Sequence, residues 1–113
     1  MKYMCLVYTA EDGALRPGTK VEYPSVARAM RDAGVFLGSG LLQPAGSATT
    51  IRVRHGETLL TDGPFAEIKE QLGGYFLLEC ADLDEAMKWA ATIPVARYGS
   101  VEVRPLIAVE AAP

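Results

Sequence analysis

Apolar residues occupy both alternating sets of positions in residues 2–8, the first strand that the sequence predicts. Tyr3, Cys5 and Val7 fall on one face, and Met4, Leu6 and Tyr8 fall on the other. The predicted strand at residues 75–80 is also apolar on both faces, apart from Glu79. Because half-buried strands alternate apolar and polar residues, this pattern predicts two central strands that are covered on both sides.

Two segments have the period of amphipathic helices. The first fits residues 24–33, with Pro24 favourable at the first helical position and Gly34 placed to end the helix. The second begins with a capping box, in which Asp82 is the N-cap and Glu85 follows three residues later. Pro94 is expected to end it.

The remaining strands are shorter or less apolar. Their predicted ranges are 35–42, 48–54, 57–61 and 100–107, and the middle two form a hairpin. Pro105 favours an edge position for the last strand. The order of elements predicts an α+β domain, a split βαβ antiparallel sheet with two helices on one face and an inserted hairpin.

Two helices cover only one face of such a sheet, so the second face needs another partner. The simplest partner is a second copy of the chain, and we therefore predict a homodimer through the sheet face. Residues 1–107 form the single predicted domain, and residues 108–113 form a loose C-terminal tail.

Composition supports one soluble domain. The chain has 113 residues, of which 50% are hydrophobic, and its net charge is −3. No apolar run approaches the roughly 20 residues of a membrane helix, and no signal peptide is seen, so we expect no membrane contact and a cytoplasmic location.

Several classes of function lack the residues they require. The basic residues are scattered in an acidic chain, which argues against nucleic-acid binding. The single histidine leaves no usual zinc site, and Cys5 and Cys80 are expected to be buried reduced thiols. The glycines form no phosphate loop, and neither a metal nor a cofactor is predicted.

The ionisable groups that follow the hairpin are the densest candidate site. Asp62, Glu67, Lys69 and Glu70 would line a cleft, with Asp62 as the candidate catalytic base and Lys69 holding an anionic group. Arg97, after the second helix, is a further candidate anion ligand. Alternatively, Asp62 accepts hydrogen bonds in a turn, the others form a solvated helical turn, and Arg97 makes a surface contact.

Residues 61–75, which run from Thr61-Asp62-Gly63-Pro64-Phe65 to Tyr75, and residues 98–105 together resemble the YCII-related family, specifically its DGPF-domain branch. The resemblance extends over nearly the whole chain, to about Ile107. It implies a ferredoxin-like fold of the dimeric α/β-barrel type that dimerises through its sheets. It assigns no reaction, because most members of this branch have no known activity.

The broader family includes a branch that acts as a dehydrochlorinase on a chlorinated hydroquinone, and a His–Asp pair has been proposed as its active site. This chain has no histidine in its first predicted helix, and Ile93 stands where the aspartate would precede Pro94. That chemistry is therefore not carried over. Whether the chain is an enzyme stays open.

Three hypotheses follow. In the first, the protein holds a small polar or anionic molecule near residues 62–74, as an enzyme or only as a binder. In the second, it is a non-catalytic accessory protein of a sigma-factor-associated regulatory system, and Arg52, Arg54 and Glu57 meet the partner. In the third, the motif only specifies a turn, and Asp62→Ala lowers stability by about 1 kcal/mol.

Overall fold

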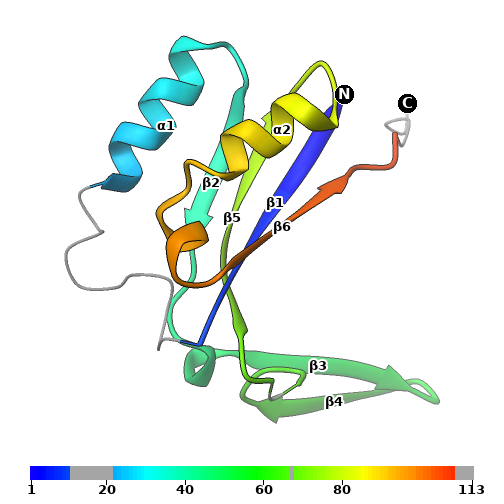
Figure 1. The fold of residues 1–113 in the computed structure, drawn as a ribbon. Helices are drawn as coiled ribbons and strands as arrows, with labels where there is room; N and C mark the ends of the chain where they lie inside the picture. Colours follow the sequence, from blue (N-terminus) through cyan, green and yellow to red (C-terminus); the bar gives the residue numbers. More distant parts are fainter. Residues whose placement is uncertain (11–21, 67, 109–113) are drawn as a thin grey trace.

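The computed structural model describes residues 1–10, 22–66 and 68–108 (Figure 1). Its helices are α1 (Glu22–Asp32) and α2 (Leu83–Ala90), with short 3₁₀ turns η1 (Ala45–Ser47) and η2 (Pro94–Arg97). Its strands are β1 (Lys2–Thr9), β2 (Phe36–Leu41), β3 (Thr49–Arg54), β4 (Glu57–Asp62), β5 (Gln71–Glu79) and β6 (Ser100–Pro105).

Four strands form one antiparallel sheet in the order β2-β5-β1-β6. Because β5 lies between β2 and β1, the β1-α1-β2 unit is split, as the sequence predicted. Strand β1 is central, and β6, which ends at Pro105, is an edge strand. The α+β prediction is confirmed, and the sheet of the single chain is open and does not close into a barrel.

Both helices cover the same face of the sheet (Figure 1). On that face Tyr3, Cys5 and Val7 of β1 are buried, together with Phe76 and Leu78 of β5. The helices contribute Tyr23, Met30, Ala86 and Ala90 to this core. The predicted placement of the two helices on one face is therefore confirmed.

The predicted capping box sets the start of α2. The backbone N–H of Glu85 donates to Oδ1 of Asp82 at 2.9 Å, and Oε1 of Glu85 accepts from the N–H of Ala81 at 2.9 Å. The α-helix ends at Ala90, before the predicted stop. Pro94 instead begins η2, where its missing N–H costs no hydrogen bond.

Other boundaries also differ from the sequence prediction, and the shorter strands do so by one or two residues. Helix α1 begins at Glu22 rather than Pro24, and β5 begins at Gln71 rather than Tyr75. The extension of β5 exists because Gln71 pairs with Thr9 at the end of β1. Residues 109–113 of the predicted tail lie outside the described residues.

The face of the sheet opposite the helices, called the open face below, is covered by no element in the described part of the chain. Met4, Leu6 and Tyr8 of β1 are half-buried there, and Leu72 and Tyr75 of β5 are exposed. The predicted cover on both sides of β1 is thus supplied on one side only. The second set of apolar residues in the β1 sequence is therefore the set that lies on the open face.

Both cysteines are buried free thiols, as predicted. Burial is the main cause that raises the pKa of Cys5 from 9.0 to about 11, and the nearby Cys80 thiol adds to this effect. Burial also raises the pKa of Cys80.

No described helix has the length and apolarity needed to cross a membrane.

The β3–β4 hairpin is a separate two-stranded sheet that projects from one end of the molecule (Figure 1). Every residue of β4 is exposed. The radius of gyration is 15.8 Å, compared with about 13 Å for a compact chain of this length. The hairpin is therefore an arm, and it makes the molecule less compact than its core alone.

Candidate functional site

The DGPF loop, residues 62–65, returns the chain from the hairpin to the sheet. Gly63 has a φ of 101°, which favours glycine, and its N–H donates to the carbonyl oxygen of Ala48 at 2.7 Å. The hydroxyl of Thr50 donates to the carbonyl oxygen of Gly63 at 2.9 Å. These two bonds fix the loop against the start of β3.

The next segment is held by a side chain that sequence reasoning did not single out. Nε2 of Gln71 donates to the carbonyl oxygens of Ile68 at 2.8 Å and Ala66 at 3.2 Å. Gln71 is itself fixed by its place in β5. No local pattern distinguishes a loop-binding glutamine from an ordinary polar strand residue, so only the fold reveals this role.

A cavity of about 580 Å³ lies beside the DGPF loop, in the corner between the open face and the arm. We call it the corner pocket. Its lining is mainly apolar, with four polar side chains. The lining residues are Tyr8, Leu42, Gln43, Pro44, Ala45, Ser47, Ala48, Pro64, Phe65, Ala66, Ile68, Gln71 and Leu72.

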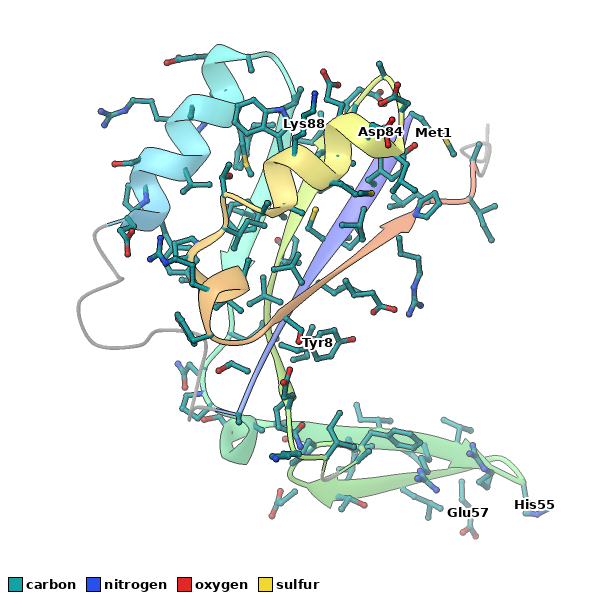
Figure 2. All side chains as sticks on the ribbon, in the orientation of Figure 1. Met1, Tyr8, His55, Glu57, Asp84 and Lys88 are labelled. Atoms are coloured by element: carbon teal, nitrogen blue, oxygen red, sulfur yellow. The ribbon has the colours of Figure 1, made fainter. Side chains whose placement is uncertain are left out.

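Tyr8 belongs to the open face and lines the pocket, so the pocket borders the open face. Figure 2 shows its ring pointing into the angle between the sheet and the arm. Its hydroxyl lies 3.4 Å from Oε1 of Glu102 on the neighbouring edge strand, to which it donates. On the arm side, Phe65 is 73% exposed, and the Arg52 guanidinium lies 4.9 Å from the centre of its ring.

The structure does not gather the predicted site residues around this cavity. Asp62 is exposed at the end of β4, Lys69 is exposed and Glu70 is half-buried, and none of the three lines the corner pocket. Glu67 lies outside the described residues. Residues 68–70 form no helical turn, although the alternative interpretation of the sequence expected a solvated helical turn here.

Arg97 lies elsewhere and is engaged. Its Nη2 donates to both carboxylate oxygens of Glu22, at 2.8 and 3.0 Å, and this ion pair joins η2 to the start of α1. The contact is exposed, so it adds little to stability. It corresponds to the surface contact that the sequence left as the alternative for Arg97.

Among the residues that the structure describes, no group of three or more His, Cys, Asp or Glu side chains could hold a metal ion. The expected absence of a metal and a cofactor stays a prediction.

The model of the YCII-related domain matches residues 1–110, which is nearly the whole chain. The chain belongs to the YCII-related family. An uncharacterized protein of Rhizobium meliloti (strain 1021) is 46% identical over 84 residues, which are 73% of this chain and 68% of that protein.

A solved structure with 13% sequence identity and a TM-score of 0.46 is the 5-chloro-2-hydroxyhydroquinone dehydrochlorinase of Burkholderia phenoliruptrix AC1100, in complex with 2,5-dihydroxybenzoquinone. The match covers 95% of this chain and 94% of that one.

The His–Asp pair that is proposed elsewhere in the YCII-related family has no counterpart here, because α1 offers Tyr23, Ser25 and Arg28 but no histidine, and Ile93 precedes Pro94. Ile93 is fully buried before Pro94. Tyr23, near the start of α1, is also buried, and burial with a hydrogen bond to Tyr98 raises its pKa well above the usual range. Ile93 and Tyr23 therefore belong to the core.

In the DGPF loop, we expect Gly63→Ala to cost more stability than Asp62→Ala. Alanine at a φ of 101° carries a strain of about 1–2 kcal/mol, although the surrounding space is free. Asp62 is exposed, and its replacement should change the free energy of unfolding by less than about 0.5 kcal/mol. Urea unfolding followed by circular dichroism compares the two variants. A larger effect at Asp62 would show that its carboxylate supports the turn.

Proposed function

We propose that the protein binds a small molecule in the corner pocket, beside the DGPF loop. The observation that carries the proposal is the cavity itself. Its volume of about 580 Å³ falls within the range of about 300–1,000 Å³ that is typical of small-molecule sites. A largely apolar lining with a few polar groups is also the usual composition of such sites.

The lining favours a ligand with a flat, mainly apolar body. Phe65, Leu72 and Ile68 supply apolar surface, and Gln43 and Ser47 supply groups that can hydrogen-bond one edge of the ligand. Among the described residues that line the pocket there is no lysine or arginine, and the Arg52 guanidinium lies at its arm side, against the ring of Phe65. The polar or anionic ligand expected from Asp62, Lys69 and Glu70 stays a prediction, as does a catalytic role of Asp62.

We also propose that the protein is a homodimer through the open face. Leu6, Leu72 and Tyr75 form an apolar surface on the sheet. Burial of this surface is favoured by about 25 cal/mol for each Å² of apolar area removed from water. A second copy presents the same surface, so a twofold axis lets both copies cover each other.

Ligand-observed NMR with a library of small phenols, aromatic amides and aromatic acids tests the pocket. Wild type is compared with Ala48→Trp, which fills the pocket, and with Ala91→Trp, which makes the same change on the exposed end of α2. We expect some fragments to bind wild type and Ala91→Trp, and to bind Ala48→Trp at least about tenfold more weakly.

Circular dichroism establishes that the variants are folded, and Ser47→Phe replaces Ala48→Trp if the latter is not. Binding of no fragment to wild type, or equal binding to the filled pocket, would contradict the proposal. Binding confined to the aromatic acids and abolished by Lys69→Ala would instead support the anionic ligand expected from the sequence.

A further inference from the structure

One face of the arm is turned toward the DGPF loop and the corner pocket. Because strand side chains alternate, Thr50, Arg52 and Arg54 of β3 share this face. The hydroxyl of Thr50 donates to the carbonyl oxygen of Gly63. The guanidinium of Arg52 lies over the ring of Phe65, which lines the pocket. These two contacts place Arg52 at the arm side of the pocket.

Arg52 differs from the neighbouring arginine in what surrounds its charge. It is exposed, and it faces the uncharged Leu59 across the hairpin. In the described part of the chain, no carboxylate forms an ion pair with its guanidinium. Arg54 instead faces Glu57, and its Nη1 donates to the carbonyl oxygen of Val53 at 3.0 Å. The charge of Arg52 is thus the one that is available beside the pocket.

The contact with Phe65 leaves Arg52 able to bind a second group. The central carbon of the guanidinium lies 4.9 Å from the centre of the ring, within the range of a cation–π contact. A guanidinium carries five N–H donors in a fixed planar fork, so a single ring contact leaves most of them available. A flat ligand that lies against Phe65 in the pocket can therefore place one edge beside these donors.

The basic residue on the sheet side of the pocket is already paired. The hydroxyl of Tyr8, which lines the pocket, donates to Oε1 of Glu102 at 3.4 Å. Nη2 of Arg104 donates to Oε2 of the same carboxylate at 2.8 Å. This carboxylate repels an anion, whereas the guanidinium of Arg52 attracts one. An anionic group of a ligand is therefore favoured at the arm side.

We propose that the ligand of the corner pocket is an aromatic carboxylic acid, whose carboxylate binds the guanidinium of Arg52 while its ring lies against Phe65. The inference rests on the proposed function, because it names the chemical class of the ligand that the same pocket takes. A carboxylate matches the planar fork of an arginine with two parallel hydrogen bonds, and its single charge matches the single guanidinium. The cationic contact is thus assigned to Arg52 instead of Lys69, which does not line the pocket.

Ligand-observed NMR with naphthoate and naphthamide tests this assignment, because the two probes differ only in the replacement of the carboxylate by an amide. We expect wild type to bind naphthoate at least about fivefold more tightly than naphthamide. Arg52→Gln should abolish this preference by weakening the binding of naphthoate alone. Arg54→Gln removes the same charge from the same face of β3, and both affinities should stay within about twofold of wild type. Added salt should reduce the preference, because Arg52 is exposed.

The outcomes separate the acid from the pocket. If no fragment of any kind binds wild type, both the pocket and the acid are overturned. Equal binding of the two probes to wild type overturns the contact with Arg52 and leaves the pocket in place. An equal loss of both probes in Arg52→Gln also overturns it, because Arg52 then acts only by positioning Phe65. A loss of naphthoate in Lys69→Ala but not in Arg52→Gln assigns the anion to Lys69 and overturns the inference.

Discussion

Gly99→Ala should lower the free energy of unfolding by about 3 kcal/mol, near the upper end of the effects of overpacking. Gly99 lies between η2 and β6, against the end of β1. A Cβ there would collide with the carbonyl oxygen of Tyr8 and lie 3.0 Å from Cγ1 of Val95 and 3.4 Å from Cα of Thr9. Because two of these contacts are to backbone atoms, the strand has to move.

Gly38→Ala is the matched control for this prediction. Gly38 also lies in the main sheet, in β2, but nothing approaches within 4 Å of the place its Cβ would take. We expect a change of less than about 1 kcal/mol for the control. Both values come from urea unfolding, and equal effects of the two substitutions would mean that β6 tolerates the displacement.

The sequence predicted the parts of the fold that depend on local patterns. The two apolar faces of residues 2–8 predicted a central strand, and β1 does lie between β5 and β6, although the described part of the chain covers only one of its faces. Asp82 and Glu85 placed the start of α2, since their hydrogen bonds are made within one turn. Both features can be read from the sequence, because the cap joins residues that are close in the chain and the strand pattern is a regular alternation.

The sequence could not predict the site, because the corner pocket is built from four separate segments. Its lining comes from Tyr8, from residues 42–45, 47 and 48, from residues 64–66 and 68, and from residues 71–72. The direction of the arm decides which side chains of the DGPF loop face it, and no local pattern fixes that direction. Of the ionisable residues that suggested a site, Asp62, Lys69 and Glu70 therefore do not line the pocket, and Glu67 lies outside the described residues.

Arg97 illustrates the same difficulty at longer range. Its partner Glu22 is 75 positions away, on a helix that packs next to η2 only in the folded chain. An exposed arginine in a loop can bind an anionic ligand or a carboxylate of its own chain, and the sequence motif is the same in both cases. Only the three-dimensional structure shows that the guanidinium of Arg97 is already paired with the carboxylate of Glu22.

Leu78→Ala should lower the free energy of unfolding by about 3–5 kcal/mol. Leu78 is fully buried in the core between the sheet and the helices. Removing its side chain loses the transfer free energy of the buried methyl and methylene groups and leaves a cavity among rigid neighbours. Urea unfolding measures the loss, and a change below about 1 kcal/mol would mean that the core collapses around the smaller side chain.

Leu77→Ala is the informative companion, because it makes the same substitution at the next position, on the open face. Leu77 is half-buried in the single chain, which predicts a smaller loss of about 1 kcal/mol. If two copies pack through the open face, Leu77 is buried in the dimer, and its replacement costs stability that depends on protein concentration. The wild-type unfolding midpoint should then rise with concentration, less so for Leu77→Ala, and the Leu78→Ala variant should keep the wild-type slope. A wild-type midpoint that does not change with concentration would argue against the interface, while the predicted effect of Leu78→Ala would stand.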